Sequence, residues 1–141
     1  MVLDFRHKND GEAITVDDVE KELERIKYEI QPLDIVLVWT GADAAWGTDQ
    51  YLVKGAGMSR ESTLFLTEKG VKVVGIDAWS WDRPLPYQAA DFQQNGDAKV
   101  IWEAHFAGID IGYCHMEKMA NLAAIGQSHG FQVCCFPVKI K

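Results

Sequence analysis

Hydrophobic residues recur at helical spacing in the first third of the chain. Four apolar side chains fall on one face, with charged residues between them: Val19, Leu23, Ile26 and Ile30. Thr15 and Asp18 stand at the spacing of a capping box, in which both side chains accept backbone N–H groups that the first helical turn leaves unpaired. Pro32 cannot continue a helix. The pattern therefore predicts a helix that begins after Thr15 and ends just after Ile30.

Two apolar runs follow: Ile35 to Trp39, directly after Asp34, and Val71 to Ile76, in which Lys72 is the one polar side chain. Runs of this length are typical of strands that are covered on both faces. Between them, Ser59 and Gly70 bound a segment with N-cap and C-cap chemistry, so we expect a helix over 59–69. A strand, a helix and a strand in that order indicate a βαβ unit with parallel strands and a right-handed crossover. The predicted fold class is α/β.

The remaining segments carry weaker signals. Val2 to Arg6 favours a short strand, and the Asp10-Gly11 turn after it indicates a hairpin. We also predict a helix over 87–94 and a last strand over 131–140, in which Pro137 indicates an edge position or a bulge. The glycine pair Gly55 and Gly57 favours a tight loop with close backbone approach. A nucleotide-binding loop is the alternative, although no strand ends directly before it.

Trp79 and Trp81 follow the second predicted strand. Ligands of parallel sheets bind beyond the carboxyl ends of the strands, and two residues spaced by two in an extended backbone point to the same side. We therefore expect both indole rings to line a site for an aromatic substrate. The alternative is a pair of rim aromatics that close the core.

Composition narrows the classes of protein to which this chain can belong. The chain has 141 residues, 48% of them hydrophobic, with 14 basic and 21 acidic side chains and a net charge of −7. This length suits one domain over residues 1–141, and the acidic balance argues against a nucleic-acid partner. No apolar run is long enough to span a bilayer and no signal peptide is evident, so we expect a cytoplasmic protein with no membrane partner. The three cysteines show no metal or disulfide spacing, so we expect buried, reduced thiols: Cys114, Cys134 and Cys135.

The segment 103–117 concentrates side chains that can ligate zinc, manganese or iron. They are His105, Cys114, His115 and Glu117. The twelve-residue spacing between His105 and Glu117 matches no generic local metal motif. From the pattern alone, the alternative is that these histidines bind no metal and are isolated side chains, either hydrogen-bonded or exposed.

Three segments resemble the Putative cyclase family of metal-dependent hydrolases, which includes bacterial kynurenine formamidase and isatin hydrolase. They are residues 34–41, 70–82 and 112–122, in the same order as in the family, and residues 130–140 are similar as well. The resemblance implies an α/β domain of the swivelling β/β/α type, with a mixed sheet and a βαβ unit. It also implies hydrolysis of an amide, formamide or cyclic amide at a zinc or manganese ion.

The resemblance assigns His105 and Glu117 as metal ligands. His115 has no family role that the resemblance assigns, and no catalytic residue is assigned. The family's N-terminal motif, His-x-Gly-Thr-His-x-Asp, is absent: the only Gly-Thr pair is Gly47-Thr48, without flanking histidines. We therefore expect two of the family's ligands and an incomplete family domain, comprising its middle and C-terminal portions.

Two functions remain open at this point. The first is a hydrolase of small aromatic amides with an incomplete metal site, for which we expect weak metal binding and no turnover by the isolated chain. The second is a non-catalytic binding fragment that forms a homodimer or larger homo-oligomer through surfaces exposed by the missing segment.

Overall fold

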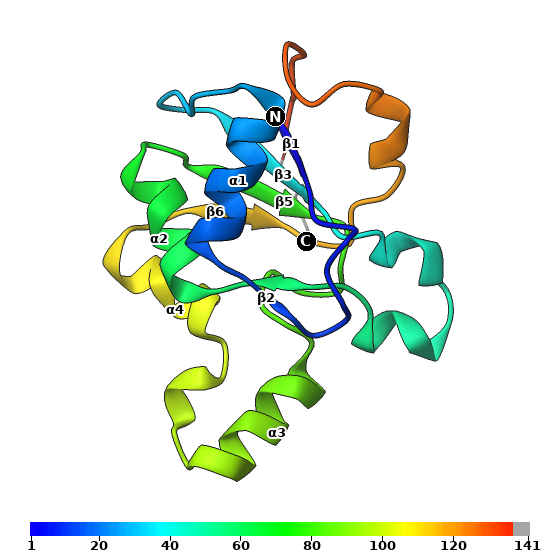
Figure 1. The fold of residues 1–141 in the computed structure, drawn as a ribbon, viewed down its shortest axis with the longest axis vertical. Coiled ribbons are helices and arrows are strands. Elements are labelled where there is room, and N and C mark those ends of the chain that lie inside the picture. The colour runs from blue at the N-terminus through cyan, green and yellow to red at the C-terminus, as the bar shows by residue number, and fades with distance from the viewer. Residues whose placement is uncertain (137–141) are drawn as a thin grey trace.

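The computed structural model describes residues 1–136 and contains a four-stranded parallel sheet (Figure 1). The strand order is β1-β3-β5-β6, formed by Val2–Asp4, Ile35–Trp39, Val73–Ile76 and Cys114–Met116. All three strand pairings are parallel, where the resemblance implied a mixed sheet. The predicted α/β class is confirmed, and so is the parallel pairing of the two apolar runs.

Helix α1 (Val16–Ile26) begins with the predicted capping box, in which Thr15 and Asp18 bond each other's backbone N–H groups. The helix ends four residues earlier than predicted. Lys27 adopts a left-handed conformation, with φ of 55°, and its N–H bonds the carbonyl oxygens of the last turn. Ile30 is nevertheless buried in the core, because the chain beyond the helix folds back onto it. Spacing alone assigned Ile30 to the helix and was wrong.

The βαβ unit consists of β3, α2 (Arg60–Glu68) and β5. Ser59 caps α2 as predicted, by accepting the N–H of Ser62. Val36 and Val38 belong to one apolar cluster and Leu37, between them, belongs to another. This alternation shows that β3 is covered on both faces, as its continuous apolar run predicted. The first cluster contains the buried apolar side chains of α1 and α2, and α4 (Glu103–Asp110) packs against α2.

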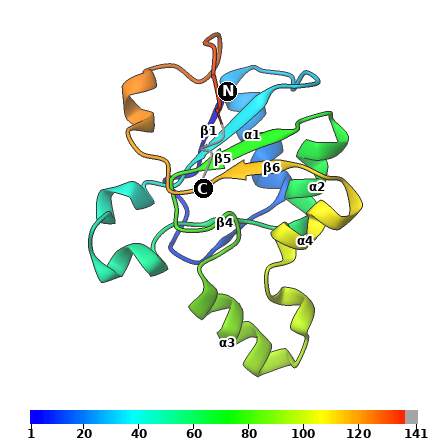
Figure 2. The same ribbon diagram turned by 180° about the vertical axis from the view of Figure 1, so that it is seen from behind.

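The opposite face of the sheet is covered by the last described segment. Leu122, in the short 3-10 helix η4 (Leu122–Ile125), packs with Val2 and Leu37. The N–H of Val2 bonds the carbonyl oxygen of Ser128 at 2.7 Å. Figure 2 shows this segment, coloured orange to red, beside the β1 edge of the sheet.

A second, two-stranded parallel sheet pairs β2 (Ala13–Ile14) with β4 (Gly57–Met58). The predicted N-terminal hairpin is therefore wrong: β1 pairs with β3, and β2 pairs with a strand more than forty residues away. Close backbone approach at Gly57 is confirmed, because a Cβ atom there would lie 2.1 Å from the backbone nitrogen of Arg83.

The other helices connect these layers. Helix α3 (Leu85–Asn95) confirms the helix predicted over 87–94 and lies at the end of the molecule away from the N-terminus (Figure 1). The 3-10 helices η1 (Ala42–Ala45), η2 (Asp49–Val53) and η3 (Ala98–Val100) lie in the connections. None of the helices in residues 1–136 has both the length and the apolar character that a bilayer crossing requires.

Two predictions for the C-terminal region differ from the structure. Residues 131–136 form no strand, and the rest of the predicted strand lies outside the described residues. The prediction of buried thiols is wrong, because Cys114, Cys134 and Cys135 are all free and exposed. Cys114 lies on β6, which is an edge strand of the sheet.

Candidate metal centre

His105 is the third residue of α4, and the start of this helix is held by a distant carboxylate. Trp102 precedes the helix in a left-handed conformation and offers no side-chain cap. Asp82 takes that place: its Oδ1 accepts the N–H of Ala104 at 2.7 Å and its Oδ2 accepts the N–H of His105 at 3.2 Å. A negative charge at a helix N-terminus satisfies unpaired N–H groups and suits the helix dipole. The loop after β5 therefore fixes the backbone position of His105, from which the side chain extends.

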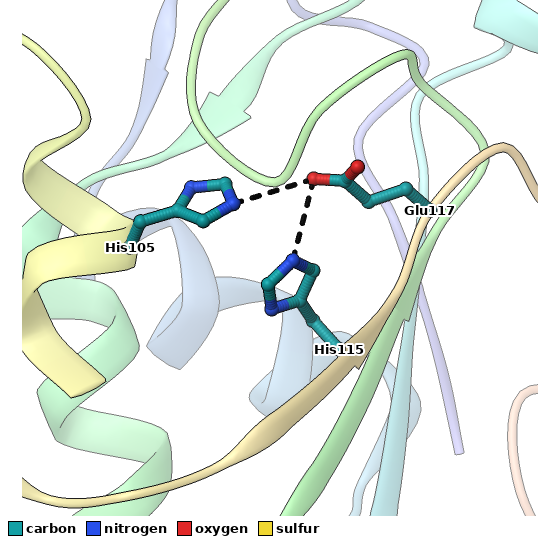
Figure 3. A group of neighbouring side chains, drawn as sticks. All are labelled: His105, His115 and Glu117. Carbon is teal, nitrogen blue, oxygen red and sulfur yellow. Dashed lines mark ion pairs between the residues drawn. The ribbon is translucent and has the colours of Figure 1, made fainter. Parts of the chain in front are cut away.

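His115 and Glu117 lie at the carboxyl end of β6, two residues apart. In extended backbone such residues point to the same side, and Figure 3 shows both side chains directed toward His105 on α4. Oε1 of Glu117 lies 3.5 Å from Nε2 of His105 and 3.5 Å from Nε2 of His115. Strand β6 and helix α4 therefore place two imidazole rings around one carboxylate.

His105, His115 and Glu117 each offer one ligand atom, and these atoms lie within 4.8 Å of one another. Their side chains are 27%, 28% and 21% exposed, so solvent and a ligand reach the group. The two predicted family ligands are thus brought together, and His115 joins them. Cys114 does not belong to the group, because neighbouring residues of a strand point to opposite sides.

Glu117 is held by two further contacts. Its Oε1 accepts the backbone N–H of Trp81 at 3.0 Å, and its Oε2 lies 3.3 Å from Nζ of Lys118. The Lys118 ammonium also donates to the carbonyl oxygen of Trp79 at 2.9 Å. The first contact comes from the loop after β5, and the second comes from the residue next to Glu117 in the sequence. They orient the carboxylate without any ligand present.

Aromatic rings surround the two histidines. The ring centroid of His105 lies 4.8 Å from that of Trp102 and 4.6 Å from that of His115, both edge to face. Burial, and secondarily the neighbouring His105, lowers the pKa of His115 below its ordinary value. Burial raises the pKa of Tyr113, whose hydroxyl donates to the carbonyl oxygen of Ala104 at 2.9 Å. The lowered pKa favours the uncharged imidazole of His115, the form that ligates metals.

The donor set fits a first-row divalent ion. Two imidazole nitrogens and one carboxylate oxygen are ligands that zinc and manganese both accept, and catalytic zinc sites hold the ion through three protein ligands of this kind. The sequence led us to expect two ligands from this chain, and the structure groups three side chains that could act as ligands.

The two tryptophans expected at the site lie in different environments. Trp79 is 44% exposed and lines a cavity of about 370 Å³ with Trp46, Tyr51 and Leu52. Trp81 is fully buried, and its indole N–H donates to Oγ1 of Thr63 on α2 at 3.0 Å. The expectation that both rings line one side is wrong for Trp81, because the loop after β5 is not extended and turns this ring into the core. A substrate-binding role for Trp79 stays a prediction.

Sequence reasoning missed Asp82 and gave His115 no role. Asp82 lies at the end of a segment already singled out, but only the fold shows that it reaches α4. His115 carried a usable signal: the alternation His115-x-Glu117 places two ligand side chains on one side of a strand. Assigning that strand from three residues required knowledge of its pairing with β5.

Solved structures share this fold. An isatin hydrolase bound to the product analogue thioisatinate superposes with a TM-score of 0.69 at 18% identity, over 87% of this chain and 47% of that one. Isatin hydrolase A from Labrenzia aggregata, bound to benzyl benzoate, gives 0.68 at 21% identity, over 87% and 48%. A protein described as a predicted metal-dependent hydrolase from Bacillus stearothermophilus gives 0.56 at 22% identity, over 83% and 45%. The chain spans about half the length of these proteins.

The family was identified from sequence. No curated protein matches the chain significantly. The family model described as Putative cyclase matches residues 1–83, more than half of the 141 residues. The match includes Asp82 and the loop after β5, and it ends before His105. The chain belongs to the Putative cyclase family.

Proposed function

We propose that this chain forms a metal-dependent hydrolase centre that acts on an amide, formamide or cyclic amide. The observation that supports it is the convergence of His105, His115 and Glu117, whose ligand atoms lie within 4.8 Å of one another. The cyclase-family membership and the hydrolase names of the structural neighbours agree with this chemistry. Zinc and manganese are the ions we propose.

When bound, a divalent ion polarises a carbonyl oxygen and lowers the pKa of water that it coordinates. His105 on α4 would hold that ion together with His115 on β6 and Glu117 directly after it. Glu117 keeps its orientation through the Trp81 N–H and the Lys118 ammonium. The partial exposure of the group leaves room for a substrate carbonyl to approach it.

For the substrate we propose an aromatic amide whose ring rests against Trp79. The cavity beside this indole is lined by further aromatic rings, and flat aromatic faces stack well on such walls. Lys118 connects the two regions: its Nζ lies 4.3 Å from the Trp79 ring centroid and 3.3 Å from Glu117 Oε2. The isatin hydrolases among the neighbours are consistent with this substrate class.

The family motif His-x-Gly-Thr-His is absent from the sequence. We therefore propose that the centre in this chain has fewer ligands than a family member that carries the motif. The expected consequence is metal binding that is weaker, and turnover that is slow, in the isolated chain.

The test begins with metal-free protein titrated with Zn²⁺ and, separately, Mn²⁺ against a chromophoric chelator. We expect one equivalent of metal and slow, metal-dependent hydrolysis of an N-formyl aromatic amine. Glu117→Gln keeps an acceptor for the Trp81 N–H but weakens the ligand set, so binding should be lost. His129→Gln is the control, since His129 contacts the carbonyl oxygen of Ile26 away from the centre. Failure of the wild-type chain to bind either ion would overturn the proposal.

A second candidate function is homo-oligomerisation, favoured by apolar side chains on the outer surface of α4. Phe106 is 52% exposed and Ile109 is 78% exposed, three residues apart on the helix. Contact between two copies would remove this surface from water. Sedimentation at high concentration should show a dimer or larger species that Phe106→Glu disperses. A strictly monomeric wild-type chain would contradict this function.

A further inference from the structure

Asp82 is a buried carboxylate that joins the loop after β5 to the candidate metal centre. The residue is 2% exposed, and the carboxylate contacts the N–H groups of Ala104 and His105 as well as the Nδ1 atom of the His105 ring. The two backbone contacts are sufficient to cap α4. The third, to the imidazole, goes beyond a helix cap.

We infer that Asp82 is the positioning residue of the metal centre, which fixes both the rotamer and the tautomer of His105. This inference rests on the proposed function. An ionised carboxylate can only accept hydrogen bonds, so the His105 proton must lie on Nδ1. In the neutral ring, the form that ligates a metal, Nε2 then carries the free lone pair.

The orientation of the ring supports this role. Nε2 of His105 lies 3.5 Å from Oε1 of Glu117 and makes no hydrogen bond to another residue between 1 and 136. The atom that Asp82 leaves unprotonated is thus the one that faces the other two ligands (Figure 3). Hydrogen bonds of this kind orient metal-ligating histidines and raise their basicity.

Asp82 is itself held in place. A Cβ atom at Gly57 would lie 2.2 Å from the Asp82 carbonyl carbon, so β4 presses directly on this backbone. The neighbouring Trp81 is fixed from both ends, since its carbonyl oxygen accepts the Met58 N–H at 2.8 Å and its indole is buried. The Asp82 carboxylate therefore orients the His105 ring from a backbone position that its neighbours hold in place.

The first test uses metal-free wild-type protein in mildly alkaline buffer. Two-dimensional ¹⁵N–¹H NMR of the imidazole rings distinguishes the two neutral tautomers, and His105→Gln assigns the signals. We expect His105 to be protonated at Nδ1. A His105 ring protonated at Nε2 alone would overturn the inference, and this measurement requires no variant of Asp82.

The second test compares Asp82→Asn with Asp77→Asn. Both carboxylates are buried in the loop after β5 and accept two backbone N–H groups, but Asp77 bonds Thr40 and Gly41 and touches no metal ligand. In Asp82→Asn the amide cannot accept from both backbone N–H groups and from Nδ1–H together. We expect its Zn²⁺ affinity to fall about 10- to 100-fold, whereas Asp77→Asn should lose stability and keep its affinity.

The outcomes separate this inference from the proposed function. If the wild-type chain binds neither Zn²⁺ nor Mn²⁺, the proposed function fails, while the NMR measurement still tests the Asp82–His105 contact. If the wild-type chain binds Zn²⁺ and Asp82→Asn binds it equally well, the positioning role is overturned and the metal centre stands. Equal loss of affinity in Asp82→Asn and Asp77→Asn would reduce Asp82 to a structural residue and also overturn the role.

Discussion

Nε2 of His115 lies 3.5 Å from Oε1 of Glu117, on the same side of an edge strand. His115→Gln should therefore remove one of three ligands and lower Zn²⁺ affinity by more than the roughly 10- to 100-fold typical of groups that only support a ligand. A chelator-competition titration measures this loss. Cys114→Ser, the preceding and exposed position of β6, is the control and should bind like the wild-type chain. Unchanged affinity in His115→Gln would remove His115 from the centre.

Trp79 and Trp81 should respond differently to replacement by alanine. Trp81→Ala empties a fully buried site and should cost about 3–5 kcal/mol of unfolding free energy. Trp79→Ala removes a half-exposed ring, so its stability should change by less than about 1 kcal/mol. Its affinity for an aromatic amide should fall because the wall of the cavity is lost. Urea unfolding and a ligand titration measure the two effects, and unchanged ligand affinity in Trp79→Ala would count against its role.

Gly57 should not tolerate a side chain. A Cβ atom there meets the backbone of Asp82 and Arg83 rather than the end of a flexible side chain, so the loop after β5 must shift. Gly57→Ala should lower the free energy of unfolding by about 1–3 kcal/mol. It should also weaken Zn²⁺ binding, because the same shift moves Asp82. Gly112→Ala adds a Cβ atom where nothing lies within 4 Å and should cost far less.

Asp18 should make stability depend on pH in acid. Burial raises the pKa of this carboxyl, but the hydrogen bonds from Lys8 and Thr15 outweigh it and lower the pKa from 3.8 to about 2. A pKa that is lower in the folded state gives stability that is fully present above pH 4 and is lost as the pH falls toward 2. The shift corresponds to about 2 kcal/mol.

Urea unfolding at a series of pH values measures this loss. Asp18→Asn should be less stable at neutral pH and should show a flatter acid dependence. Asp17→Asn, an exposed position in the same turn, is the matched control and should follow the wild-type curve. A wild-type curve as flat as that of Asp18→Asn would contradict the prediction.

Local signals predicted most of the elements around the sheet. The capping box at Thr15, the N-cap at Ser59 and the apolar runs of β3 and β5 depend on interactions within a few residues, and all were confirmed. The pairing of β1 with β3 in place of a hairpin was not predictable in this way. A turn sequence favours a hairpin locally, but the partner of a strand is decided by which apolar faces the whole sheet buries.

The candidate site shows the same division. The amino-acid sequence by itself determined the α/β class, the βαβ unit and the cyclase resemblance, from which His105 and Glu117 were predicted as ligands. Only the tertiary structure decided that the side chain of His115 lies beside them, that Trp81 belongs to the core, and that Asp82 reaches the His105 ring. The physical reason is that composition and spacing describe residues that are neighbours along the chain, whereas a metal centre needs ligand atoms that lie a few ångströms apart in space. Here those atoms come from a loop, a helix and an edge strand, which meet only when the sheet has formed.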